Sequence, residues 1–496
     1  MSVLEAFGNA RVDGTRRAIG TRLEQSGVYL FVISVSCAYY ILNAPTMLSH
    51  LDLGWHLAAG DLIRERGAVP FQDPWSFTLG ERQWFNASWL WDVTASVIFQ
   101  HAGFSGLVFL AVACGAIIAG YLTSICLRAG ASPLAVCIAV VAACLLYPCY
   151  ATPPNIYLAA APNMATMLFS VIFFGECLRR TRCLVLPLIM LLWVNSHGGF
   201  VLGFLIIGVF TGVAVLKRDR ASFRIYTITG IACFLAIFVN PLGWRIYFGV
   251  VTTVGHFVQV YITEWMSFFH NMPLPGSIPA ILYILAFAAL NLRFGSSVAV
   301  SLEARLLAWL FLFLGIYQFR YISSFFLFST VVMALYIDRL LPAQLERFNV
   351  RRALLAAGVV AACALPLAFA HVRPALGFHP LISEQDANYL RTHLAHKRLL
   401  NHWNTGGLLI FYTRGTVPVF VDGRAATAYP DDLLRDYFKL IQIEIDAPTW
   451  DAILDKYKID AVLWPKMHDE LRQFLVGKRG WKEVHTSAFE TVYVKP

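Results

Sequence analysis

Long apolar runs recur through most of this chain, and short polar connections separate them. Runs such as LVFLAVACGAIIAGYL and ALLAAGVVAACALPLAFA approach or exceed the length that a helix needs to cross a hydrocarbon core of roughly 30 Å. The pattern predicts about eleven membrane-spanning helices, near residues 27–46, 105–127, 132–149, 158–178, 183–195, 200–216, 223–241, 277–292, 304–318, 322–337 and 353–371. Residues 1–371 are therefore expected to fold as a polytopic α-helical membrane protein.

The pattern changes near residue 372. Charged residues become more frequent, and the segments TVPVFVDGR, AVLWP and TVYVKP have the composition of β-strands. The segment PTWDAILDKYK has the periodicity of an amphipathic helix that leads into a strand. Residues 372–496 are expected to form a separate α/β domain outside the cytoplasm.

Composition agrees with a membrane location. The hydrophobic fraction is 58% and the charged fraction 14%, whereas soluble proteins carry about a quarter charged residues. The net charge of +9 comes from basic residues at the ends of predicted helices, where they set orientation in the bilayer. Nucleic acid is therefore not an expected partner, and membrane lipids are.

The basic residues also predict topology, because cytoplasmic loops are enriched in lysine and arginine. With the N-terminus in the cytoplasm, this side holds Arg11, Arg16, Arg17, Arg22, Arg128, Arg179, Arg180, Arg182, Lys217, Arg218, Arg220, Arg293, Arg339, Arg347, Arg351 and Arg352. The opposite side then holds the first outer loop at 46–89, the turn NSHGG, the stretch 240–265, the turn around Arg320 and the C-terminal segment.

The first outer loop carries the strongest candidate chemistry. Residues Ser49 to Arg66 are predicted to form a helix on the membrane surface, on which Asp52 and His56 share one face. Gly60 continues that face and would allow a ligand or another backbone to approach closely. A structural alternative stays open, in which Ser49 and Asp52 form a capping box and His56 is an interfacial histidine.

Further candidates lie in other outer segments. Asp73, before Pro74, is either a turn former or a second carboxylate. His197 lies in a turn between two apolar segments, where it either completes the turn or binds a phosphate or an acceptor. Arg320 either extends to the interface or holds a lipid phosphate, which suits a guanidinium group. Arg245 and Glu264 either pair with each other or join the same site.

Four motifs together resemble a known superfamily. The pattern DxxWHLxxGxxIxxxGxxPxxDPxSFT runs from Asp52 to Thr78, and WVNSHGGF, NPLGW and VDGRA follow it. The chain is similar to the GT-C superfamily of membrane glycosyltransferases. These include protein O-mannosyltransferases, the lipid A aminoarabinose transferase and the catalytic subunit of oligosaccharyltransferase.

The resemblance implies a reaction and roles for some residues. Asp52 would be the catalytic base and Arg320 would hold the donor phosphate, with Asp73 or Glu264 as a second carboxylate. The better-known members have an adjacent acidic pair at the start of the loop, whereas this chain has Asp52-Leu53. A divalent cation, Mg²⁺ or Mn²⁺, is therefore left open as a cofactor.

The implied function is inverting transfer of a sugar from a polyprenyl-phosphate donor to a glycan, lipid or protein acceptor. The motifs are most similar to those of bacterial members, which predicts a bacterial inner-membrane protein with a periplasmic site. Three alternatives stay open: a polysaccharide polymerase or ligase, a membrane transporter and a non-catalytic scaffold. A transporter is expected to carry ionisable residues near mid-membrane, and the predicted spans have almost none near their centres.

Overall fold

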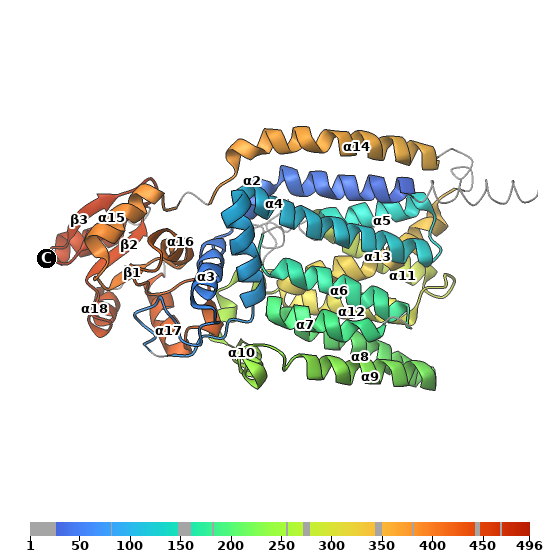
Figure 1. The fold of residues 1–496 in the computed structure, drawn as a ribbon, viewed down its shortest axis with the longest axis horizontal. Coiled ribbons are helices and arrows are strands. Elements are labelled where there is room, and N and C mark those ends of the chain that lie inside the picture. Colours follow the sequence, from blue (N-terminus) through green and yellow to red (C-terminus); the bar gives the residue numbers. More distant parts are fainter. Residues whose placement is uncertain are drawn as a thin grey trace, which may run out of the picture.

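The computed structural model describes residues 26–80, 82–146, 160–180, 183–253, 256–270, 278–342, 350–378, 381–441, 447–466 and 469–496. Figure 1 shows a bundle of roughly parallel helices at one end of the molecule and a mixed α/β region at the other. Short helices that run across the bundle lie between the two regions.

The predicted apolar segments each overlap a helix of the bundle. These helices are Ser26–Leu42, α4 (Trp89–Arg128), α5 (Pro133–Leu146), α6 (Asn163–Leu178), α7 (Leu186–Ser196), α8 (Val201–Leu216), α9 (Arg220–Ala236), α11 (Ile278–Phe294), α12 (Leu302–Tyr317), α13 (Ile322–Leu340) and α14 (Val350–Val372). Within the described residues, four helical stretches are long and apolar enough to cross a membrane: Trp89–Arg128, Gly198–Leu216, Phe319–Leu340 and Arg352–Ala375. The helical membrane fold is thus confirmed, and the number of spans stays a prediction.

Burial differs sharply between the helices of this bundle. In the most apolar window of Phe319–Leu340, 78% of the residues are buried, because α13 packs against α5, α11 and α12. In Arg352–Ala375 only 11% are buried. Exposed apolar side chains such as Val360 and Leu367 would be unfavourable in water, so lipid is the solvent that suits this outer helix.

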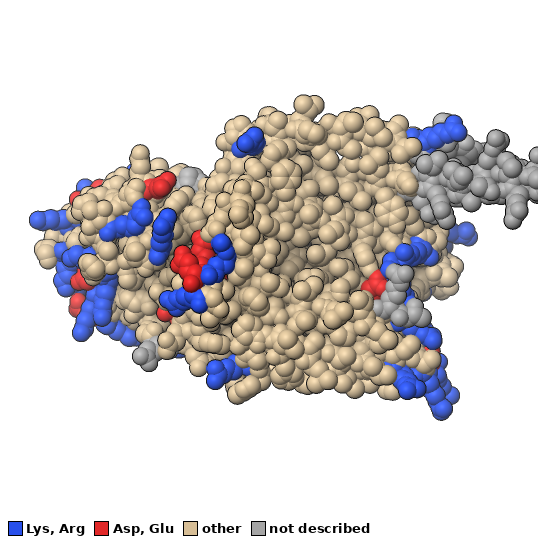
Figure 2. Space-filling view, in the orientation of Figure 1, with Lys and Arg blue, Asp and Glu red and all other residues tan. Residues whose placement is uncertain are grey.

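Charged side chains collect beyond the ends of the bundle and leave a nearly uncharged band between them (Figure 2). At one end, Lys217 pairs with Glu303 at 2.8 Å and Arg180 pairs with Asp219 at 3.5 Å. These are connections that the basic pattern assigned to one side of the membrane. Which compartment that side faces stays a prediction.

Helix α3 (Leu53–Arg66) runs across the end of the bundle, between α4 and α16 (Trp403–Thr413) (Figure 1). A Cβ atom at Gly60 would overlap the main chain of Asp92, and one at Gly54 would lie 2.5 Å from the carbonyl oxygen of Gly407. The two glycines therefore let α3 pack tightly against a helix on each side.

The start of α3 differs from the prediction. The helix begins at Leu53 rather than near Ser49, and Asp52 makes no side-chain capping hydrogen bond. The Ser49 hydroxyl instead donates to the carbonyl of Thr46 at 2.7 Å. The capping-box interpretation is wrong, because the preceding short helix α2 (Ala44–Leu48) already engages Ser49.

The C-terminal region contains a four-stranded sheet in the order β1-β2-β4-β3. Its strands are β1 (Leu399–Asn401), β2 (Ala461–Pro465), β3 (Lys482–Thr486) and β4 (Glu490–Val494). β1 and β2 are parallel, with Leu399 opposite Ala461, and the other pairs are antiparallel. The helices here are α15 (Glu384–Leu394), α16, α17 (Asp431–Leu440), α18 (Ala447–Lys456) and α19 (Asp469–Arg472).

Two predicted strands and the predicted helix of this region are present, but the strand expected in TVPVFVDGR is not. Within that segment only Val419 makes bridges, to Ser76 and Leu399. Pro418 has no N–H group for a ladder, and the chain then turns to bury Asp422 and Arg424. The domain boundary at 372 stays a prediction.

Glu490 gives this region a predicted pH dependence. Its side chain is buried, with 1% exposed, and burial raises its pKa to about 8 from an ordinary value of 4.5. The native state therefore keeps a proton that the unfolded chain releases near pH 4.5. The stability from this group is complete below about pH 4.5 and is lost as the pH rises to about 8.

Replacing Glu490 with glutamine is expected to flatten the fall in melting temperature across this pH range. The effect is measured by thermal unfolding of the detergent-solubilised full chain at pH values from about 5 to about 9. Glu470→Gln, at an exposed position, is the matched control. An identical pH slope in wild type and Glu490→Gln would show that this carboxyl does not titrate as described.

Candidate functional site

The candidate site lies where the bundle meets the C-terminal region. Asp52 stands immediately before α3 and is partly exposed. A Cβ atom at Gly423 would overlap the Oδ1 atom of Asp52, so the two residues are in direct contact. The motifs DxxWH and VDGRA, which are distant in sequence, therefore meet at the carboxylate of Asp52.

Three ionisable groups, Asp52, His56 and Glu264, lie within electrostatic range of His50. The backbone N–H of Asp52 donates to Nδ1 of His50 at 3.3 Å. Burial lowers the pKa of His50, and the charges of Asp52, His56 and Glu264 also act on it. The four groups are thus close enough to influence one another. His50 was not among the predicted site residues.

His56 belongs to a buried hydrogen-bonded chain. Its Nδ1 atom lies 2.6 Å from Oδ1 of Asp92, and the Nδ2 atom of Asn86 donates to Oδ2 of Asp92 at 2.8 Å. The Asp92 side chain is fully buried, and the ring of His56 stacks on Trp55 with centroids 3.6 Å apart. These contacts fix the orientation of the His56 ring through its Nδ1 atom.

His197 lies in the turn between α7 and α8. Its Nδ1 atom is 2.6 Å from Oγ1 of Thr166 on α6. Burial lowers the pKa of His197 to about 3, and the charges of Arg320 and His56 add to this effect. The imidazole is therefore neutral at physiological pH and lies within electrostatic range of both groups.

Arg320 lies in the 3-10 turn Phe319–Tyr321, immediately before α13. Its guanidinium carbon lies 4.5 Å from the centre of the Trp265 ring, a cation–π arrangement. The backbone N–H of Phe319 donates to the carbonyl of Met266 at 2.8 Å. Trp265 also donates through Nε1 to Glu264 at 2.9 Å, so one tryptophan connects the acid and the cation.

The place of Arg245 in the site stays a prediction. It lies in the turn Gly243–Arg245 with an exposed side chain, beside the exposed Trp244. Among the described side chains, no ion pair joins Arg245 to Glu264. An arginine next to an exposed tryptophan suits the membrane interface.

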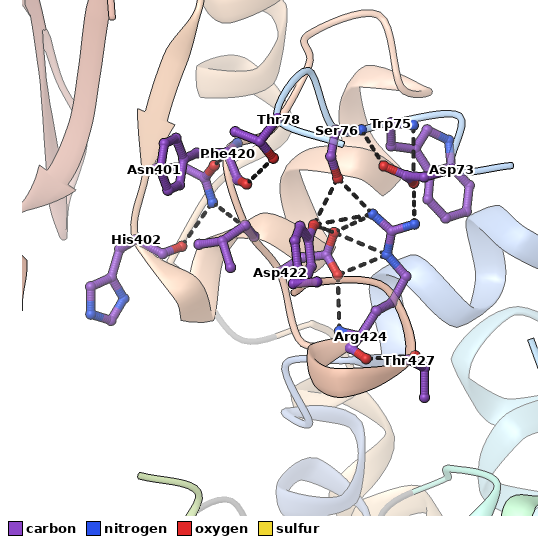
Figure 3. Close-up of polar contacts among 12 residues, drawn as sticks. Asp73, Trp75, Ser76, Thr78, Asn401, His402, Phe420, Asp422, Arg424 and Thr427 are labelled. Carbon is purple, nitrogen blue, oxygen red and sulfur yellow. Dashed lines mark hydrogen bonds and ion pairs between the residues drawn. The ribbon is translucent and has the colours of Figure 1, made fainter. Parts of the chain in front are cut away.

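Asp73 belongs to a separate set of contacts, beside the VDGRA motif. Its carboxylate accepts from the backbone N–H groups of Trp75 and Ser76, at 3.3 and 2.8 Å, which is the geometry of a turn former. It also forms an ion pair with Nη1 of Arg424, whose Nη2 atom lies 2.7 Å from Oδ2 of Asp422 (Figure 3).

The three charged side chains of this ion-pair cluster, Asp73, Asp422 and Arg424, have no exposed surface. The guanidinium carbon of Arg424 lies 4.9 and 5.0 Å from the ring centres of Trp75 and Trp84. The cluster therefore fastens the first outer loop to the C-terminal region, and its carboxylates have no access to a substrate.

Within the parts of the chain that the structure describes, no group of three His, Cys, Asp or Glu side chains is arranged to hold an ion. The possible Mg²⁺ or Mn²⁺ cofactor stays a prediction, and no chemical step below depends on one.

No family model and no curated protein matches this sequence. Solved structures do match it. The oligosaccharyltransferase of Archaeoglobus fulgidus, tethered to an acceptor peptide with the NVT sequon, aligns with a TM-score of 0.58 at 11% identity over 93% of this chain and 74% of that one. The chain has the GT-C fold.

Two further GT-C structures align over most of this chain. The oligosaccharyltransferase AglB from Archaeoglobus fulgidus, with an inhibitory peptide and a dolichol-phosphate, gives a TM-score of 0.56 at 11% identity over 90% of this chain and 71% of that one. ArnT from Cupriavidus metallidurans, in the apo state, gives a TM-score of 0.47 at 13% identity over 93% of this chain and 97% of that one. The sequence resemblance to the GT-C superfamily is confirmed at the level of the fold.

Proposed function

We propose that this GT-C chain is a membrane glycosyltransferase that moves a sugar from a polyprenyl-phosphate donor to an acceptor hydroxyl. The observation that carries the proposal is the cluster of Asp52, His56, His197, Glu264 and Arg320 around the end of the bundle. It combines a carboxylate and a guanidinium at the end of an apolar bundle, where a lipid-linked phosphate can reach both.

Asp52 is the catalytic base in this proposal. It takes the proton of the acceptor hydroxyl while the acceptor oxygen bonds to the anomeric carbon of the sugar. The bond between that carbon and the phosphate oxygen breaks, and the phosphate keeps the electron pair. A single displacement of this kind inverts the anomeric centre, and a positioned base contributes about 10²–10⁴-fold to the rate.

Arg320 stabilises the charge that develops on the departing phosphate. A fixed cation at the point where negative charge appears is a large source of catalysis, and guanidinium groups match phosphate oxygens in geometry. The stacking of Arg320 on Trp265 limits the orientations of the guanidinium, which reduces the entropy lost when the phosphate binds.

The donor class is supported by the dolichol-phosphate bound to AglB in one matching structure. The acceptor is a glycan, a lipid or a protein. In this proposal the site faces the periplasm of a bacterial inner membrane, in the orientation that the basic residues predict.

The proposal is tested by turnover in nanodiscs. Purified full-length protein is incubated with a panel of polyprenyl-phosphate sugars, with and without acceptors, and released polyprenyl phosphate is measured by mass spectrometry. We expect acceptor-dependent release that falls at least tenfold in Arg320→Gln, by loss of a charged hydrogen bond of about 1.5–3 kcal/mol. Arg245→Gln, at an exposed arginine, is the control. Equal turnover in Arg320→Gln and wild type would contradict the role of Arg320.

Gly423 provides a second test, because it sets the position of Asp52. Replacing it with alanine would force the new methyl group into the Asp52 carboxylate. We expect transfer to fall by about a hundredfold, since a displacement of about 1 Å at a reacting group has an effect of that size. Gly477→Ala, where the added carbon meets nothing within 4 Å, is the control. Wild-type transfer rates in a folded Gly423→Ala variant would show that catalysis does not depend on the contact between Gly423 and Asp52.

A further inference from the structure

The hydrogen bonds around His197 determine which ring nitrogen carries its hydrogen. The backbone N–H of Gly199 donates to Nδ1 at 3.2 Å. The Nε1–H group of Trp193 donates to Oγ1 of Thr166 at 3.0 Å, and this Oγ1 lies 2.6 Å from the same Nδ1 atom. An amide N–H and an indole N–H can only donate. Nδ1 of His197 is therefore an acceptor, and the Thr166 hydroxyl donates to it.

The consequence is a neutral imidazole with its hydrogen on Nε2. Burial and the charge of Arg320 keep the pKa of His197 low, at about 3, so the ring does not gain a second proton at physiological pH. The Nε2–H group is then a fixed hydrogen-bond donor that carries no net charge.

The local packing requires this arrangement. Thr166 is 4% exposed and Trp193 is fully buried, so neither exchanges its partner for water. A Cβ atom at Gly199 would overlap Oγ1 of Thr166. The second glycine of the HGG sequence is therefore needed for the threonine to reach the histidine ring.

His56 is held by a different partner. Its Nδ1 atom lies 2.6 Å from Oδ1 of Asp92, a buried carboxyl group. The rings of the two histidines are therefore each fixed through Nδ1, one by a carboxyl group and the other by a hydroxyl group. The Nε2–H group of His197 suits an oxygen that carries negative charge.

We propose that Thr166 and Trp193 are positioning residues that hold His197 as an Nε2–H donor to the phosphate of the lipid-linked sugar, beside Arg320. The proposal rests on the glycosyltransferase function given above and assigns the phosphate subsite within it. A neutral donor adds a hydrogen bond to the phosphate without repelling the guanidinium. A second cation at this position would repel Arg320.

The test is binding of a polyprenyl phosphate to the full-length protein in phosphatidylcholine nanodiscs, measured by calorimetry. Thr166→Val removes the hydroxyl at nearly constant volume, and Thr166→Ser keeps it. We expect Thr166→Val to weaken binding by about tenfold, as for loss of one well-made hydrogen bond. We expect Thr166→Ser to bind within a few-fold of wild type.

A double-mutant cycle separates positioning from general loss of structure. If Thr166 acts through His197, Thr166→Val has no further effect on binding in a His197→Ala background. Two results would overturn the inference and leave the glycosyltransferase proposal standing. One is unchanged binding in Thr166→Val. The other is an equal loss of affinity on adding Thr166→Val to the wild type and to the His197→Ala variant. Absence of binding by folded wild-type protein would overturn both.

Discussion

Replacing Asp52 with asparagine is expected to abolish sugar transfer and to leave the fold intact. The substitution removes the proton acceptor but keeps the size and shape of the side chain in contact with Gly423. Because Asp52 is partly exposed and makes no capping hydrogen bond, the loss of its charge has little effect on stability. The rate of transfer should fall by about 10²–10⁴-fold, the usual contribution of a general base.

The matched control for this prediction is Asp61→Asn on the same helix. Asp61 accepts hydrogen bonds from Ser96 at 2.5 Å and Gln100 at 2.8 Å on α4, away from the cluster. We expect transfer by Asp61→Asn within a few-fold of wild type. Steady-state release of polyprenyl phosphate measures both variants, and their melting temperatures check the fold. Full activity of Asp52→Asn would remove Asp52 as the base.

Replacing Arg424 with methionine is expected to have the largest effect on stability in this molecule. The change leaves the carboxylates of Asp73 and Asp422 buried side by side without their cation. Removing one partner from a buried ion pair typically destabilises a protein by about 3–5 kcal/mol. The free energy of unfolding, from denaturant titration of the detergent-solubilised chain, measures this loss.

A surface arginine of the same region is the control. Arg435 lies 4.0 Å from Asp431 and its side chain is 56% exposed, so Arg435→Met should cost less than about 1 kcal/mol. A triple variant that combines Arg424→Met with Asp73→Asn and Asp422→Asn should recover part of the lost stability. Unchanged stability in Arg424→Met with complete loss of transfer would instead place Arg424 in the catalytic machinery.

The apolar helices could be predicted because a single physical requirement, burial in hydrocarbon, controls both their length and their composition. The strand predicted at Thr416–Arg424 failed for a different reason. Its alternating apolar residues are buried, but the segment ends in Asp422 and Arg424, whose partner Asp73 lies in the first outer loop. A local pattern contains no information about an ion pair that spans more than three hundred residues.

The site residues also fall into two groups: those that a local sequence pattern reveals and those that it does not. Spacing along one helix was sufficient to group Asp52 with His56, and their placement around one cluster follows from the turn that starts α3. His50, Asp92 and Thr166 were missed, because each acquires its role only through contacts that folding creates. Asp92 is the clearest case: its position in the first turn of α4 also suits a simple interaction with the helix dipole.

The most direct test of the central claim is a cryo-electron microscopy structure of the protein with a non-hydrolysable polyprenyl-phosphate sugar in a nanodisc. The account predicts that the phosphate contacts Arg320 and Nε2 of His197, with the anomeric carbon turned towards Asp52 and the polyprenyl chain against the helical bundle. A phosphate bound at the opposite end of the bundle, near Lys217 and Arg180, would contradict it.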